Sequence, residues 1–161
     1  MNEYKYYVAV KFDLLNEKFF YFTNIDDLAL GDDVVCDTEK GVRIGRVASK
    51  LIPCDGKDLN LEPLVRKATS DDLLINDDNE KRCVEVIEFV KKQIEFLGLN
   101  MNPLKAEYSL DATKLLIVYV SEERVDFREL LKILAAKYHC RIELRQINTR
   151  DKAKGWRCKK T

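Results

Sequence analysis

Histidine and tryptophan are almost absent from this chain of 161 residues, which has one of each, His139 and Trp156. A single histidine argues against a common mononuclear zinc site, because such sites draw several ligands from His and Cys. The five cysteines are scattered and include no CxxC pair, a pattern typical of reduced thiols in a reducing compartment. We expect no metal ligands in this chain.

Catalytic motifs are also missing from the sequence. GxSxG, GxxxxGK and HExxH do not occur, and no paired carboxylates accompany a nucleophile. His139 is followed by Cys140, but neighbouring residues of a helix point about 100 degrees apart, so this pair is not a dyad. A structural histidine is favoured over a general base, and we predict that the chain is not an enzyme.

Long hydrophobic runs are absent too. No run approaches the roughly 18 apolar residues that cross a bilayer, and MNEYKYYVAV at the start lacks a secretory pattern. Charged residues make up 35% and hydrophobic residues 46%, proportions typical of a globular protein rather than a disordered one. We expect a cytoplasmic protein without membrane insertion.

The chain has no net charge, but its charges are unevenly placed. Acids dominate between residues 71 and 88, and bases dominate from residue 141 onward. One interpretation is two contact surfaces of opposite sign; the alternative for the acids is that they complement the dipole at a helix start. The candidate partner-binding acids on the helix are Asp71, Asp72, Glu80, Glu85 and Glu88. The candidate residues for binding nucleic acid or a partner are Arg66, Lys67, Arg141, Arg145, Arg150, Lys152, Lys154 and Trp156.

The first part of the chain, residues 1–60, is predicted to be a small antiparallel β unit. Aromatic and β-branched residues predict strands over 4–12, 18–23, 33–38 and 42–48, and Gly41 supplies the positive φ of a tight connection. The pattern G-D-x-V followed by G-x-x-x-G-x-V also resembles small SH3-like barrels, which often bind RNA or proteins.

The second part predicts an α-β-β-α-β order. A helix capped near Thr69 or Ser70 ends at Gly98, with an interruption expected around 76–79, and strands follow over 104–110 and 114–120. A second helix begins at Asp126, with Glu129 completing a capping box. We expect both helices on one face of an antiparallel sheet in a ferredoxin-like layer, which gives an α+β fold.

The last predicted strand, over 141–147, places Arg141, Glu143 and Arg145 on one face. A solvated sheet face is the ordinary explanation, since antiparallel sheets commonly expose one side to water. The alternative is a surface that binds phosphate or an acidic partner.

A family resemblance lies in VDFRELLKILAAKY..RIELRQI..RDKAK, with LVRKATSDDL upstream. These segments resemble the bacterial YaaT/RicT proteins, which share a domain with the eukaryotic polymerase-suppressor proteins. The resemblance places the shared domain over residues 61–154 and leaves 155–161 as a basic tail. It implies a cytoplasmic, non-enzymatic factor that acts with two small helical proteins, YlbF and YmcA, to influence mRNA processing by RNase Y.

The resemblance also implies iron–sulfur clusters in the family's complexes. Family members continue into a stretch rich in glycine and cysteine, GGIGPCGR..CC, which this chain does not match; only Cys158 lies in that region. Because a cluster normally takes about four thiolates, we expect no cluster on this chain alone. The sequence fits either a reduced family member or a piece of a longer chain.

Two functions of different class therefore remain. The first is an adaptor in an RNA-processing assembly, in which the acidic helix binds small partners and the basic surface binds RNA or the nuclease. The second is a module that binds RNA or DNA directly through the basic residues and Trp156, because an aromatic ring can stack on a base.

Overall fold

A computed structural model describes residues 3–147 and divides into two compact units, Met1–Leu73 and Leu74–Thr161. Each unit has its own sheet, and the α+β class is confirmed. The unit boundary follows residue 73 rather than residue 60, because Arg66–Lys67 pairs with the first sheet. Within residues 3–147, no helix combines the length and the apolarity of a membrane span.

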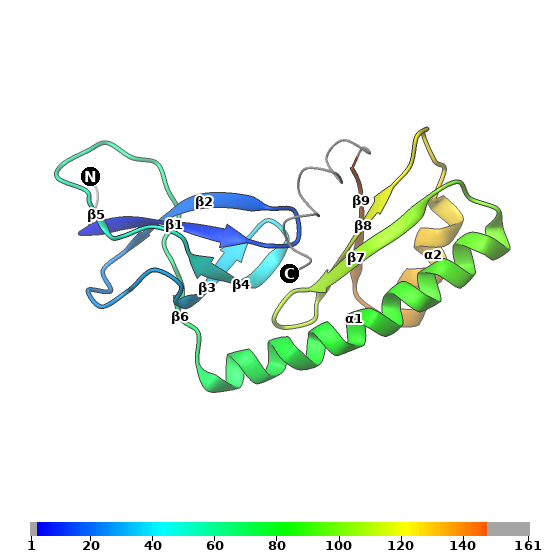
Figure 1. The fold of residues 1–161 in the computed structure, drawn as a ribbon, viewed down its shortest axis with the longest axis horizontal. Coiled ribbons are helices and arrows are strands. Elements are labelled where there is room, and N and C mark those ends of the chain that lie inside the picture. Colours follow the sequence, from blue (N-terminus) through cyan, green and yellow to red (C-terminus); the bar gives the residue numbers. More distant parts are fainter. Residues whose placement is uncertain (1–2, 148–161) are drawn as a thin grey trace. The chain divides into compact units, whose positions relative to one another are not determined.

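The first unit is built from antiparallel pairs of strands (Figure 1). The main strands are β1 (Tyr6–Phe12), β2 (Glu17–Thr23), β3 (Asp33–Thr38) and β4 (Gly41–Val47), with the short β5 (Ile52–Pro53) and β6 (Arg66–Lys67). Their order is β2-β1-β4-β3-β6, and β5 pairs with β1. The four predicted strands are present and pair as two hairpins, β1 with β2 and β3 with β4. The described strands do not close into a barrel, because β2 and β6, at the two ends of the order, do not pair with each other.

The second unit contains most of α1 (Ser70–Leu97), then β7 (Asn102–Tyr108), β8 (Lys114–Val120), α2 (Arg128–Tyr138) and β9 (Arg141–Ile147). The predicted element order is confirmed, and β8 is the central strand of the order β7-β8-β9. The expectation of an antiparallel sheet was wrong for β9, which pairs with β8 in parallel. A ferredoxin-like layer has a strand before its first helix. The described residues of the second unit include no such strand, and α2 carries the chain directly from β8 to its parallel neighbour.

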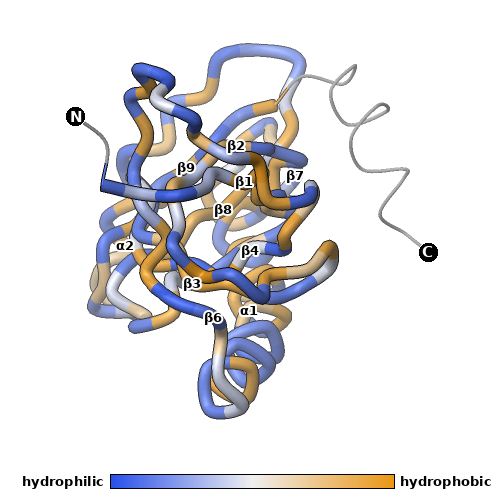
Figure 2. Tube along the Cα trace, turned by 90° about the vertical axis from the view of Figure 1, so that its left-hand side faces the viewer, coloured by the Kyte–Doolittle hydropathy of each residue, from blue (hydrophilic) through white to orange (hydrophobic). Residues whose placement is uncertain are grey.

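One face of the second sheet packs on both helices (Figure 1). Cys83, Val90 and Ile94 of α1 lie in this core, so the apolar side of the helix packs on the sheet. Leu130 and Leu134 of α2 are fully buried there. The alternation of hydrophilic and hydrophobic colour along α1 follows from this arrangement (Figure 2).

The ends of α1 agree with the sequence, but its middle does not. Thr69 and Asp72 exchange capping hydrogen bonds at the start, and Gly98, with φ of 67°, ends the helix. Leu99 N–H then donates to Ile94 O over 3.0 Å, as in a Schellman motif. The expected interruption at 76–79 is wrong: the helix is continuous, and the buried Asn79 side chain donates to Ser109 O over 3.3 Å.

The predicted capping box of α2 is also corrected. The N-cap is Phe127 and makes no side-chain capping bond. The Asp126 carboxylate instead accepts from the backbone N–H and the guanidinium of Arg128, which lowers its pKa to about 2. Glu129 pairs with Lys132 over 3.6 Å, so it does not reach back toward Asp126.

Candidate interaction surfaces

The face of β9 that points away from the helix core carries Arg141, Glu143 and Arg145, as the sequence predicted. Ile142 and Leu144 alternate with them and pack on the core. All three charged side chains are exposed. At about 3.3 Å per residue, the Cα atoms of the two arginines lie roughly 13 Å apart along the strand.

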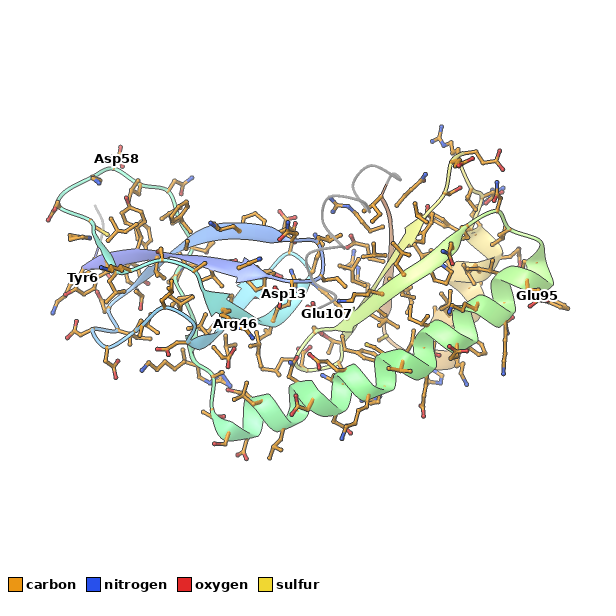
Figure 3. All side chains as sticks on the ribbon, viewed as in Figure 1. Tyr6, Asp13, Arg46, Asp58, Glu95 and Glu107 are labelled. Atoms are coloured by element: carbon orange, nitrogen blue, oxygen red, sulfur yellow. The ribbon has the colours of Figure 1, made fainter. Side chains whose placement is uncertain are left out.

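The register with β8 and β7 extends this face into rows. Arg141 lies beside Lys114, and Arg145 and Lys105 flank the buried Val118. Between these rows, Glu107 (labelled in Figure 3) and Glu143 flank Leu116. The face therefore alternates basic, acidic and basic, with four cations and two carboxylates. We call these six residues the charged sheet face.

Two cations of the charged sheet face are open among the described residues. Lys105, Glu107 and Lys114 are engaged in interactions of their own. Neither Arg141 nor Arg145 has an ion pair with any residue in the range 3–147. Their guanidinium groups keep their hydrogen-bond donors for an external carboxylate or phosphate.

Four of the acidic candidates on α1 are exposed, and the fifth, Asp72, is buried. Glu80, Glu85 and Glu88 are exposed on the helix, next to Val84, whose side chain is 65% exposed. Asp71 is exposed in the first turn. Glu95 continues the exposed side of the helix and points away from the sheet (Figure 3). We call Glu80, Glu85 and Glu88 the acidic helix face.

Asp72 does not belong to an open surface, and its prediction as a partner contact is corrected. It is 5% exposed and accepts from Thr69 N–H and from Arg66 Nη2, both over 2.8 Å. The Thr69 backbone N–H lowers the pKa of this carboxyl, and Arg66 adds to the effect. Its role is to start α1.

The two upstream basic candidates have carboxylate partners in the structure. Arg66 pairs with Asp72, and Lys67 lies 3.2 Å from Asp27 and 3.9 Å from Asp32. An incoming phosphate would have to compete with these carboxylates, so Arg66 and Lys67 are weaker candidates than the β9 arginines.

We expect Asp72→Asn to destabilise the chain by about 1 kcal/mol at pH 7, because it removes a charged cap. The folded pKa of Asp72 lies below the unfolded value near 3.9, so this stabilisation is complete above that value and is lost as pH falls through the folded pKa. Urea unfolding at pH 7 and pH 3 measures the difference. The exposed Asp77→Asn should change stability by less than about 0.5 kcal/mol. An equal cost of Asp72→Asn at both pH values would contradict this origin.

Comparison with known proteins identifies a family for the part of the chain that carries these surfaces. Residues 62–147 match the PSP1 C-terminal conserved region. The chain is also 32% identical over 149 residues to the stage 0 sporulation protein YaaT of Bacillus subtilis (strain 168), covering 91% of this chain and 54% of that protein. This chain belongs to the YaaT family. It spans about half the length of the YaaT protein that it matches, and no solved structure matches it.

The PSP1 C-terminal conserved region contains both faces described above, since residues 62–147 include α1 and the sheet of the second unit. Arg150, Lys152, Lys154, Trp156 and Cys158, which sequence reasoning also singled out, lie outside the described residues.

The cysteines of this YaaT-family chain are free thiols in the described range. Cys36, Cys54 and Cys83 are buried, and burial raises the pKa of Cys36 to about 12 and that of Cys83 to about 11. Such thiols are poor nucleophiles. No cluster of three or more His, Cys, Asp or Glu side chains suited to a metal occurs within residues 3–147. The expectation about iron–sulfur clusters stays a prediction.

Sequence reasoning missed one charged surface, which lies on the first sheet, outside the PSP1 C-terminal conserved region at 62–147. Lys11, Lys18 and Arg46 come from three different strands, so no charge run announces them. The available signal was the alternation within each strand, but their meeting depends on the pairing register.

Proposed function

We propose that this chain is a non-enzymatic, sporulation-associated adaptor similar to RicT, which acts in a complex that influences mRNA processing by RNase Y. The acidic helix face binds small helical proteins similar to YlbF and YmcA. The charged sheet face, together with the basic segment after it, binds the nuclease or RNA. The family match and the name of the Bacillus subtilis relative, a stage 0 sporulation protein, support the sporulation-associated role.

The observation that carries the proposal is the openness of Arg141 and Arg145 on one face of β9. Their neighbours Ile142 and Leu144 pack against the helix core, which fixes the face of the sheet from which the arginine side chains project. Two guanidinium groups on one face of a strand are suited to a complementary acidic surface, because each planar group can bind a carboxylate or phosphate through two parallel hydrogen bonds.

The acidic helix face offers the opposite chemistry. Glu85 and Glu88 are one turn apart on the exposed side of α1, while Val86 and Val90 hold the other side in the core. An exposed apolar residue between acids, here Val84, suits a basic amphipathic partner helix. This face supports the helical-partner half of the proposal.

His139 does not need a catalytic role to explain its position. It is exposed, has φ of 53°, and donates its backbone N–H to Ala135 O where α2 ends. It therefore serves as the left-handed C-cap of the helix. This supports the prediction of a non-enzymatic protein.

Two charge reversals test the proposal and act as controls for each other. We expect Arg141→Glu/Arg145→Glu to weaken binding to RNase Y or RNA by about tenfold or more while binding to the small helical proteins is retained. Glu85→Lys/Glu88→Lys should give the opposite result. Calorimetric titration of each pair measures both arms.

A further variant, Arg128→Glu/Lys132→Glu, makes the same charge change as the arginine reversal on the exposed side of α2 and should leave both interactions intact. Thermal unfolding shows whether each variant folds. If reversal of Arg141 and Arg145 unfolds the chain, the pair is structural. If every variant loses both interactions equally, the two-surface proposal is wrong.

The second candidate, direct binding of RNA or DNA through the basic C-terminal surface, is favoured by the same open arginines. Salt separates the two candidates. Binding to phosphates should weaken steeply as ionic strength rises, with a slope set by the number of contacts, whereas docking of a partner through apolar contacts should respond less.

A further inference from the structure

Three cations lie side by side on one face of the first sheet. Lys18 of β2 is opposite Lys11 of β1, and Lys11 is opposite Arg46 of β4. Directly opposed residues have Cβ atoms about 4.5–5.5 Å apart, and like charges at this distance are destabilising. We call Lys18, Lys11 and Arg46 the cation row; Arg46 is labelled on β4 in Figure 3.

The carboxylates near the cation row do not neutralise it. Among the described residues, Lys11 and Lys18 have no ion pair, and Arg46 Nε is 3.9 Å from Asp33 Oδ1, at the end of the row. The first unit as a whole has fourteen Asp and Glu against ten Lys and Arg. The row is therefore a local concentration of positive charge on an otherwise acidic unit.

Aromatic rings lie on the same face as the cation row. Because side chains alternate along a strand, Phe20 shares a face with Lys18, and Tyr7 shares one with Lys11. Phe20 is 45% exposed, and its ring meets Tyr7 edge to face at 5.8 Å between centroids. The Lys57 ammonium lies 5.7 Å from the Tyr7 ring centroid.

The combination of opposed cations and an exposed ring fits one class of ligand. Three cations in line match the phosphates of a nucleic-acid backbone, and an exposed ring next to them offers a surface on which a base can stack. A duplex hides its base faces, and an acidic peptide has no need of the ring. The edge-to-face contact with Tyr7 restricts the Phe20 ring, which lowers the conformational freedom that the ring would lose on binding.

We propose that the cation row and Phe20 bind single-stranded nucleic acid, with phosphates on Lys11, Lys18 and Arg46 and a base on Phe20. This site lies on the first unit, whereas both surfaces of the proposed adaptor lie on the second, so the two proposals stand or fall separately.

The neighbouring residue Phe19 provides a matched control. It is 46% exposed, next to Phe20 in sequence, and on the opposite face of β2, where its ring lies 6.3 Å from that of Phe12. Phe19→Ala and Phe20→Ala therefore remove the same side chain at the same exposure from the two faces of one strand.

The probe is a fluorescein-labelled oligouridylate of about 12 nucleotides, titrated with the full chain at low salt and followed by fluorescence anisotropy. Phe20→Ala should weaken binding roughly 5- to 150-fold, the range measured when a stacked aromatic is removed. Phe19→Ala should bind like the unmodified chain. Repeating the titrations of both phenylalanine variants in an Arg141→Glu/Arg145→Glu background removes any contribution of the β9 arginines to oligonucleotide binding.

Lys11→Gln/Lys18→Gln should reduce the slope of log affinity against log salt by about 1.4, since each phosphate contact on a single strand contributes about 0.7. Thermal unfolding confirms that each variant is folded. The proposal is overturned if the chain does not bind the oligonucleotide at low salt, if Phe19→Ala loses as much as Phe20→Ala, or if polyglutamate or a duplex competes as well as the single strand.

Discussion

Leu134→Ala is expected to cost the second unit about 2–5 kcal/mol, the range for a leucine truncated in a packed core. Leu134 is fully buried between α2 and the sheet, together with Leu130 and Ile117. For a unit of this size the unfolding midpoint should fall by about 10 °C or more. Calorimetry of the full chain measures the shift.

The consequence for the charged sheet face makes this prediction informative. α2 connects β8 to β9, and β9 is an edge strand with β8 as its one paired neighbour among the described strands. Weakening of the α2 core should therefore expose the amides of β9 to exchange before those of β8. Leu131→Ala is the matched control, since Leu131 is only partly buried on the same helix. An equal cost at both positions would contradict the packing of α2 through Leu130 and Leu134.

Gly45→Ala is expected to destabilise the first unit by roughly 1–3 kcal/mol, because the core has no room for one more carbon. A Cβ at this position would collide with Val10 and lie 2.8 Å from Cε1 of Phe12. Phe12 is not free to retreat, since the Arg43 guanidinium lies 4.5 Å from its ring centroid and Tyr21 packs edge to face against it. Urea unfolding followed by circular dichroism measures the cost.

The double variant Gly45→Ala/Val10→Ala tests the cause. If the clash with Val10 carries the effect, shortening Val10 should relieve part of it, and the double variant should lose less stability than the sum of the two single variants. Strictly additive costs would show that the glycine is needed for another reason. This core positions β1 and β4, which carry two members of the cation row.

Local signals in the sequence predicted where the helices and strands lie better than they predicted which strands pair with one another. Thr69 and Gly98 mark the ends of α1 through short-range capping chemistry, and the strand predicted over 114–120 is β8, the central strand of its sheet. The parallel pairing of β9 was not predictable in this way, because it depends on which strands are absent from the sheet. β6 was missed because two residues carry no periodicity.

The candidate sites show the same division. Alternation alone placed Arg141 and Arg145 on one face of a strand. It did not reveal that Asp72 is buried in the cap of α1, since an aspartate three residues after a threonine looks like any other acid of a first turn. At α2, the Asp126 carboxylate accepts a hydrogen bond from Arg128 and does not cap the helix. The capping pattern in the sequence gives no sign of this competing hydrogen bond. The cation row forms only when three strands pair in the observed register, so no single strand of the sequence reveals it.

Amide hydrogen exchange on the reconstituted complex tests the central claim most directly, that a folded scaffold presents open cations of β9 to a partner. The chain is mixed with RNase Y and the small helical proteins similar to YlbF and YmcA, and exchange is compared with that of the chain alone. The account predicts new protection over residues 141–147 and around Glu85 and Glu88, with unchanged exchange in the helix core. Complex formation without added protection in either segment would contradict it.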